Sequence, residues 1–124
     1  MKRILISEDE SILAKALKDN LKAEGYAVDI VPDGDGAINY LRTKKVDIIL
    51  LDLLMPKRDG FFVLEEIKKN PECRNIPVIV LSNLGGDTEI KRALEMGAVE
   101  YFVKSQHPIS EVVEKVKKIS EGLR

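Results

Sequence analysis

Short apolar runs and amphipathic stretches alternate five times along the chain. The apolar runs predict strands at residues 3–6, 27–31, 46–52, 78–82 and 100–103. Between and after them, apolar residues recur at the spacing of a helix face. The five stripes are Ile12, Leu13, Ala16, Leu17 and Leu21; Ala37, Ile38 and Leu41; Phe62, Val63 and Ile67; Ile90, Ala93 and Leu94; and Ile109, Val112, Val113, Val116 and Ile119. Gly25 and Gly97 are expected to end the first and fourth helices, and Asp87 or Thr88 to cap the fourth.

This alternation predicts an α/β fold, a flavodoxin-like (βα)5 doubly wound parallel five-stranded sheet. Residues 48–51 and 78–81 are continuously apolar, as in strands covered on both faces, whereas strands 27–31 and 100–103 each carry a charge, which suits edges. With the strands numbered along the chain, their spatial order is expected to be 2-1-3-4-5. Residues 1–124 are interpreted as a single domain, with no output domain in this chain.

Composition narrows the classes of function. The 124 residues hold 20 Lys and Arg against 21 Asp and Glu, a near-balance that disfavours a general nucleic-acid or anionic-membrane binder. One cysteine, Cys73, and one histidine, His107, exclude a disulfide framework and a multi-His or Cys-based metal site within the chain. No apolar run approaches the ~20 residues of a membrane span, and no signal peptide is apparent, so a cytoplasmic location is expected.

Polar side chains follow four of the five predicted strands. Glu8 and Asp9 follow the first strand, Asp52 ends the third, Ser82 ends the fourth and Lys104 follows the fifth. Each has an ordinary explanation by itself, as a turn residue, a loop hydroxyl or a surface charge. Asp52, however, lies between apolar residues on both sides and requires a cationic or metal partner. Because the carboxyl ends of parallel strands meet at one edge, the set indicates a functional site there.

The residue types at this edge favour phosphoryl chemistry. Three neighbouring carboxylates repel one another unless a cation intervenes, and oxygen ligands without His or Cys favour a hard ion, with Mg²⁺ preferred to Ca²⁺. Lys104 and the Ser82 hydroxyl can bond phosphoryl oxygens, and the central Asp52 is the natural nucleophile. No glycine-rich phosphate-binding motif occurs, so a nucleotide is not the expected donor.

Taken in order, these residues resemble a known family. They are similar to the motifs of the receiver domain of two-component response regulators, the CheY-like superfamily. The matching residues are the acidic pair Glu8 and Asp9, residues 50–56 around Asp52, Asp59 and Gly60 after them, Ser82, and Lys104. The resemblance covers nearly the whole chain. It implies a phosphorelay signalling switch that catalyses its own phosphorylation and dephosphorylation, rather than an enzyme acting on a separate substrate.

The resemblance also implies a role for each site residue. Asp52 would accept the phosphoryl group from a histidine kinase or a phosphotransfer protein, and Lys104 would pair with that group. Asp9, Asp52 and the backbone carbonyl of Leu54 would bind Mg²⁺, with Glu8 acting through water. Ser82 would then move toward the phosphoryl group, and Tyr101 would follow it inward.

The partner surface implied by the resemblance is the face formed by the fourth helix, the strand 100–103 and the last helix. A downstream protein target or output domain would bind there, with a homodimer as one option, and no direct contact with nucleic acid or membrane is expected. The residue pattern alone leaves open whether its mixed charges are a solvated face or a partner surface. These charges are Lys91, Arg92, Glu111, Glu114 and Lys115.

Two departures from the family pattern lead to further expectations. Lys104 is followed by Ser105 where the family usually has a proline in a cis bond; a non-proline cis bond costs ~3 kcal/mol, so either strain is stored there or the loop takes another path. Leu54 and Leu84 occupy positions that flank the route of the hydrolysing water in the family. Because apolar side chains cannot orient water, loss of the phosphoryl group is expected to be slow.

Three alternatives are less well supported. A phosphatase of the haloacid dehalogenase type needs a second aspartate two residues after Asp52, where Leu54 stands. A flavodoxin would have to place the FMN phosphate beside Glu8, Asp9 and Glu10, which would repel it. An interaction module without phosphorylation is disfavoured by the complete set of site residues.

Overall fold

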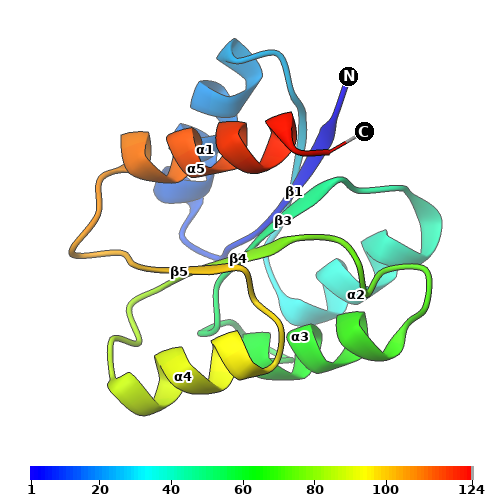
Figure 1. The fold of residues 1–124 in the computed structure, drawn as a ribbon, viewed down its shortest axis with the longest axis vertical. Coiled ribbons are helices and arrows are strands. Elements are labelled where there is room, and N and C mark those ends of the chain that lie inside the picture. Colours follow the sequence, from blue (N-terminus) through cyan, green and yellow to red (C-terminus); the bar gives the residue numbers. More distant parts are fainter. Residues whose placement is uncertain (124) are drawn as a thin grey trace.

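The computed structural model describes residues 1–123, in which five strands alternate with five helices (Figure 1). The strands are β1 (Arg3–Ser7), β2 (Ala27–Val31), β3 (Ile48–Leu51), β4 (Val78–Ser82) and β5 (Glu100–Val103). The helices are α1 (Ser11–Ala23), α2 (Gly34–Thr43), α3 (Gly60–Lys69), α4 (Asp87–Glu95) and α5 (Ile109–Glu121). Within this part of the chain, no helix combines the length and apolar composition that crossing a bilayer requires.

The strands form one parallel sheet in the order β2-β1-β3-β4-β5, which confirms the expected order. In the centre of the sheet, Ile6 pairs with Leu50 and Leu50 with Ile79. The charged strands β2 and β5 lie at the edges, as their composition predicts. The order places the carboxyl ends of β1 and β4 on either side of the carboxyl end of β3, where Asp52 follows.

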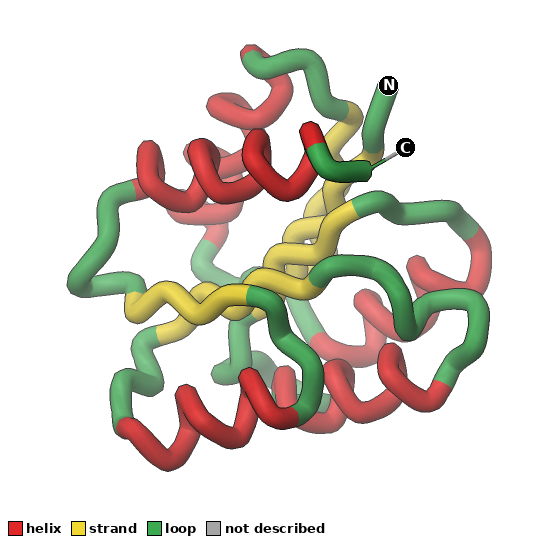
Figure 2. Tube along the Cα trace, viewed as in Figure 1, coloured by secondary structure: helices red, strands yellow, loops and turns green. Residues whose placement is uncertain are grey.

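Helices cover both faces of the sheet, and Figure 2 shows the strands between the two helical layers. Helices α1 and α5 lie on one side and α2, α3 and α4 on the other (Figure 1). Successive β3 residues enter opposite cores: Ile48 and Leu50 pack in the α1 and α5 core, Ile49 and Leu51 in the other. A strand buried on both faces needs an apolar residue at every position, which explains its unbroken apolar run.

Local sequence explains where α2 and α3 begin. The side chains of Asp33 and Asp59 accept hydrogen bonds from the backbone N–H groups of Gly36 and Phe62, at 2.8 and 2.9 Å. Each aspartate thereby caps the first turn of its helix, a contribution of about 1 kcal/mol. Helix α3 thus starts within the segment that follows Asp52.

The structure corrects four details of the predicted elements. Strand β3 is shorter than residues 46–52, and β1 extends to Ser7. Helix α4 starts one residue early, with Gly86 as its cap position and no capping side chain, so neither Asp87 nor Thr88 caps it. Ile12 is 87% exposed because the buried stripe of α1 consists of Ala14, Leu17 and Leu21.

Candidate functional site

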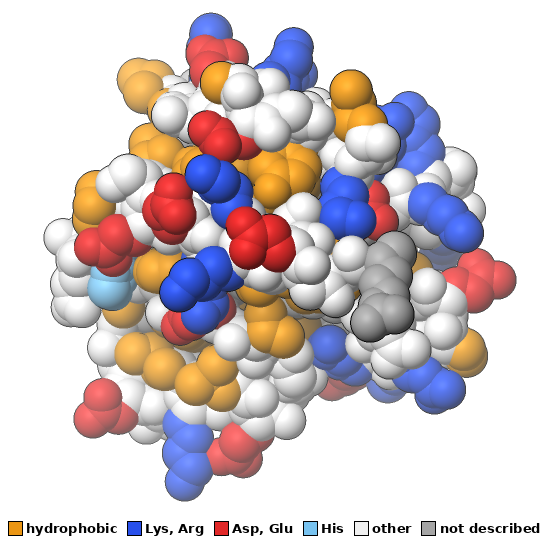
Figure 3. All heavy atoms as spheres, turned by 45° about the horizontal axis from the view of Figure 1, so that its top comes forward, with side chains coloured by type: hydrophobic (Ala, Val, Ile, Leu, Met, Phe, Trp, Pro, Cys, Tyr) orange, Lys and Arg blue, Asp and Glu red, His pale blue; other side chains and the backbone are white. Residues whose placement is uncertain are grey.

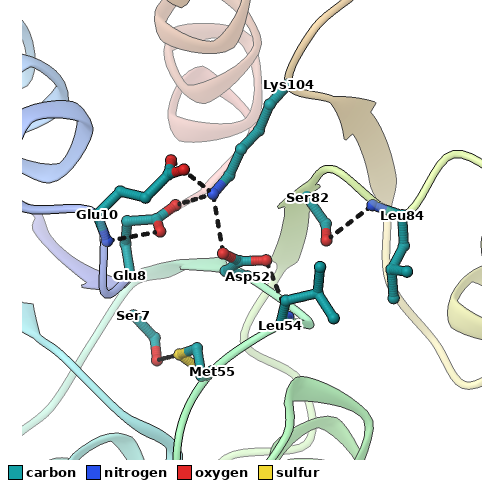
Figure 4. A network of polar contacts seen from close by, with 9 residues as sticks. All are labelled: Ser7, Glu8, Glu10, Asp52, Leu54, Met55, Ser82, Leu84 and Lys104. Carbon is teal, nitrogen blue, oxygen red and sulfur yellow. Dashed lines mark hydrogen bonds and ion pairs between the residues drawn. The ribbon is translucent and has the colours of Figure 1, made fainter.

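The polar residues at the strand ends meet at the carboxyl edge of the sheet, as predicted (Figure 4). Hydrogen bonds between neighbouring segments fix two of them: the Asp52 N–H donates to the Ser7 carbonyl at 3.0 Å, and the Lys104 N–H to the Ser82 carbonyl at 2.9 Å. Backbone hydrogen bonds of the kind that join parallel strands therefore continue beyond the strand ends and set the positions of both residues. Figure 4 shows Glu8 on one side of Asp52 and Ser82 on the other.

Lys104 is the cation at the centre of the site. Its Nζ lies 2.8 Å from Glu8 Oε1, 2.9 Å from Asp52 Oδ2 and 3.1 Å from Glu10 Oε2. An ammonium has three N–H donors, and three carboxylates are available to accept them. The side chains of Glu8 and Asp52 are 3% exposed and that of Lys104 is 10% exposed, so these ion pairs are mostly shielded from water.

Burial and ion pairing oppose each other in this cluster. For Lys104, burial favours the neutral amine, but the hydrogen bonds with Asp52 and Glu8 outweigh it and raise the pKa of the ammonium. For Glu8, burial is the stronger effect and raises the pKa of the carboxyl to about 7, although Lys104 and the Glu10 N–H both bond to its charged form. In the metal-free protein burial therefore favours the protonated form of Glu8.

The donor set fits a divalent metal ion. Glu8, Asp9 and Asp52 each offer a carboxylate oxygen, and these atoms all lie within 4.8 Å of one another. Asp9 is exposed to solvent, whereas the other two are buried. A cluster of oxygen ligands with one side open to water matches the preference of Mg²⁺, which keeps several water ligands. The residues present therefore fit the expected Mg²⁺ ion.

Ser82 and Tyr101 are both buried and both hold Leu84, at the start of the segment between β4 and α4. The Ser82 hydroxyl accepts from the Leu84 N–H at 3.3 Å, and the Tyr101 hydroxyl donates to the Leu84 carbonyl. Tyr101 is therefore already buried, whereas the resemblance to the family implies that it moves inward after phosphorylation. Its ring packs in the core shared by α2, α3 and α4.

The segments that carry Asp52 and Lys104 take particular backbone paths. No peptide bond is cis within residues 1–123, so the bond between Lys104 and Ser105 is trans, and the chain turns with Gln106 N–H donating to the Val103 carbonyl. After Asp52, the Leu54 N–H donates to Asp52 Oδ1 at 3.0 Å and fixes the carboxylate plane. Lys57 follows in a left-handed conformation, with φ of 67°.

The sequence did not indicate two contacts of the residues that follow and end β1. The Lys104 ammonium donates a hydrogen bond to the Glu10 carboxylate. The sequence feature that could have indicated this contact is that Glu10 is the third acidic residue in succession after β1. The Ser7 hydroxyl donates to the Met55 sulfur at 3.0 Å beneath the carboxylates, a contact that no sequence motif indicates (Figure 4). Both depend on side-chain directions rather than on residue spacing.

The family model of the response regulator receiver domain matches residues 4–117. The probable transcriptional regulator ycf27 of Guillardia theta is 37% identical over 106 residues, which cover 86% of this chain and 41% of that protein. The chain spans about two-fifths of the length of the curated relatives it matches first.

Solved structures of receiver domains superimpose closely. The receiver domain of the Francisella response regulator 1452 has a TM-score of 0.91 and 26% identity, with both chains fully covered. Response regulator protein TrrA of Thermotoga maritima, in complex with Mg(2+)-BeF, has a TM-score of 0.82 and 34% identity, with 96% of this chain and 99% of that chain covered. The matched motifs, the shared fold and the family model together show that the chain belongs to the response regulator receiver domain family.

Proposed function

We propose that this receiver domain accepts a phosphoryl group on Asp52, in a Mg²⁺-dependent transfer from a histidine kinase or a phosphotransfer protein. The observation that carries the proposal is the setting of the Asp52 carboxylate. It is almost fully buried, yet it lies 2.9 Å from the Lys104 ammonium and within 4.8 Å of two further carboxylates that suit a divalent cation. A buried carboxylate beside an ammonium and further carboxylates that suit a divalent cation can act as the nucleophile in aspartyl-phosphate chemistry.

The transfer itself requires little of the protein beyond positioning and charge. A carboxylate oxygen of Asp52 forms a bond to the phosphorus while the bond from phosphorus to the donor imidazole nitrogen breaks. The electron pair of the broken bond stays on that nitrogen. The imidazole is left neutral if its other nitrogen carries a proton, and otherwise becomes neutral by taking a proton from solvent. Lys104 would bind an oxygen of the transferred group, and the Leu54 N–H keeps the carboxylate oriented.

Glu8, Asp9, Asp52 and the Leu54 carbonyl would hold the metal ion. When bound, Mg²⁺ supplies positive charge that offsets the negative charge of the phosphoryl oxygens. Ser82 would bond a phosphoryl oxygen through its hydroxyl, which here accepts a hydrogen bond from the Leu84 N–H. That movement would release one of the two bonds that hold Leu84, and the Tyr101 bond to the Leu84 carbonyl couples the change to β5.

The surface of α4, β5 and α5 is where we expect a protein target or an output domain to bind, with a second copy of the chain as one option. Leu94 and Val99 are about half exposed there, and the Lys115 ammonium pairs with Glu100 at 3.0 Å. Figure 3 shows acidic and basic side chains intermixed with apolar ones on the molecular surface around α5. Such a mixed surface suits protein partners better than nucleic acid. The cytoplasmic location remains a prediction.

Intact-mass measurement tests the transfer. The protein is incubated with acetyl phosphate, with and without Mg²⁺, and a mass increase of one phosphoryl group is expected only with Mg²⁺. Asp52→Asn should abolish the increase, whereas Asp59→Asn, an exposed aspartate in the same segment whose capping role asparagine can keep, should not. Equal labelling of wild type and Asp52→Asn would contradict the proposal.

A further inference from the structure

Glu10 is the third carboxylate on Lys104, and its side chain has no other hydrogen-bond or ion-pair partner among residues 1–123. It occupies the cap position of α1, yet its side chain makes no capping hydrogen bond. Instead Oε2 reaches Lys104 Nζ at 3.1 Å, a contact between residues 94 positions apart. The Glu10 backbone N–H meanwhile donates to Glu8 Oε2 at 3.1 Å, so one residue holds both members of the Glu8 and Lys104 pair.

The three contacts of Lys104 differ in how easily they can be given up. Glu8 is 3% exposed, and removing the cation from it would leave a buried carboxylate unpaired, whereas Asp52, equally buried, is the residue that would itself carry the phosphoryl group. The Glu10 side chain is 53% exposed, so water can replace the ammonium at little cost. All three N–H donors of Lys104 have acceptors, so a phosphoryl oxygen can gain one only when an existing contact is released.

Charge makes the same contact unfavourable once a phosphoryl group arrives. Lys104 is the only cation that forms ion pairs with Glu8, Glu10 or Asp52 among residues 1–123, and Asp9 adds a further carboxylate beside them. A phosphoryl group on Asp52 brings more negative charge to the same ammonium. The carboxylate of Glu10 would then be repelled as well as displaced.

We infer that Glu10 is a positioning residue that holds the Lys104 ammonium in the unphosphorylated protein and competes for it with the phosphoryl group on Asp52. The inference rests on the proposed function. Its consequence is a built-in bias toward the unphosphorylated form. Removing the Glu10 carboxylate therefore improves binding of a phosphoryl group, a gain that a merely structural role of Glu10 could not produce.

The test compares Glu10→Gln and Glu10→Ala with the wild type and with Glu24→Gln. Glu24 is a matched control, because it is a partly exposed glutamate at the other end of α1, paired with Lys117 at 3.2 Å, and its replacement changes the net charge equally. Binding of beryllium trifluoride in the presence of Mg²⁺ is titrated by NMR, and phosphorylation by acetyl phosphate is followed by intact mass. Urea unfolding of each variant reports on the integrity of the fold.

Both Glu10 variants are expected to bind beryllium trifluoride about two- to fivefold more tightly, the range of an exposed ion pair. The gain should shrink as NaCl approaches 1 M, and Glu24→Gln should behave as wild type. Unchanged or weaker binding in Glu10→Gln and Glu10→Ala, or an equal gain in Glu24→Gln, would overturn the inference while leaving the proposed function intact. A wild type that neither binds beryllium trifluoride nor takes a phosphoryl group would overturn both.

Discussion

One ammonium and two buried carboxylates form the core of the site, and the charge state of each group depends on its burial and on its ion-pair partners. Glu8 and Asp52 share Lys104, yet burial raises the pKa of Glu8 to about 7. A raised carboxyl pKa means that the folded protein holds a proton that the unfolded chain releases at lower pH. The charge state of Glu8 therefore links the stability of the metal-free protein to pH.

Stability in metal-free buffer is expected to fall as pH rises. The contribution of Glu8 is fully present below its unfolded pKa of about 4.5 and is lost as pH rises to about 7 and above. Between pH 5.5 and 8 the loss should be about 2 kcal/mol, measured by urea unfolding in the presence of EDTA. Glu8→Gln removes the titrating group and should show a smaller loss. An identical pH dependence in both proteins would contradict this cause.

Leu54 and Leu84 bear on the lifetime of the phosphorylated form. Leu54 is about half exposed beside Asp52, and Leu84 is partly buried next to Ser82. Because neither side chain can hydrogen-bond to water, hydrolysis of the acyl phosphate is expected to take minutes or longer. Leu54→Asn should shorten the lifetime, followed by intact mass after the donor is removed, while Leu94→Asn on α4 should not. Loss of the label from wild type within seconds would refute the expectation.

Lys57 is a strained position three residues after Leu54. Its φ of 67° is left-handed, a conformation that costs an ordinary residue about 1–2 kcal/mol. Its ammonium lies 3.5 Å from Asp33, and both Lys57→Gly and Lys57→Ala remove that ion pair. Lys57→Gly should therefore be more stable than Lys57→Ala by about 1 kcal/mol in urea unfolding. The reverse order, which a helix interior would give, would show that the strain is absent.

Helix α3 is the element that supports the segment carrying Asp52. A Cβ added at Gly60, the first residue of α3, would lie 2.4 Å from the Asp52 carbonyl oxygen and 2.5 Å from Leu53 Cα, both backbone atoms. The Gly60 N–H also donates to the Leu53 carbonyl at 3.0 Å. The close approach of α3 to this segment therefore requires glycine.

Gly60→Ala should push α3 away from Asp52. The expected loss of stability is about 3 kcal/mol, at the upper end of overpacking effects, together with reduced phosphorylation of Asp52. Gly122→Ala serves as the control, since among residues 1–123 its Cβ would have the Ile119 carbonyl nearby at an ordinary 3.5 Å. Thermal or urea unfolding of both variants checks the difference. Equal stability of the two would mean that α3 can shift without cost.

At the scale of helices and strands, periodicity predicts most of the fold. The central strands are recognisable because Ile48 and Leu50 face one core and Ile49 and Leu51 the other, so every position is apolar. Boundaries are less predictable. Ile12 fits the helical spacing but is exposed, since only a tertiary contact decides which apolar residues at a helix start are covered.

The residues of the candidate site could be predicted from the sequence, but some of their contacts could not. Residue types at strand ends indicate Glu8, Asp9, Asp52, Ser82 and Lys104, because parallel strands place those ends together. The contacts of Glu10 with Lys104 and of Tyr101 with the Leu84 carbonyl follow from rotamers and loop paths. Side-chain rotamers and loop paths cannot be predicted from residue spacing, so only the structure reveals these two contacts.

For the molecule as a whole, near-neutral net charge conceals an uneven distribution. The chain carries a formal charge of -1, yet Glu8, Asp9, Glu10 and Asp52 gather around the single ammonium of Lys104 at one edge of the sheet. The helical layers shield the rest of the sheet on both faces (Figure 2). Under the proposed function, Mg²⁺ and a phosphoryl group would bind together at this edge, and a partner would respond to changes in the surface around it.

Locating the phosphoryl group on the chain tests the central claim most directly. Wild-type protein is phosphorylated with acetyl phosphate and Mg²⁺, the acyl phosphate is reduced with borohydride, and the modified residue is identified by peptide mass spectrometry. The proposed function expects the reduced residue at position 52 alone. Modification at Glu8, Asp9 or another carboxylate, or a phosphoryl group retained on Ser82, would contradict it.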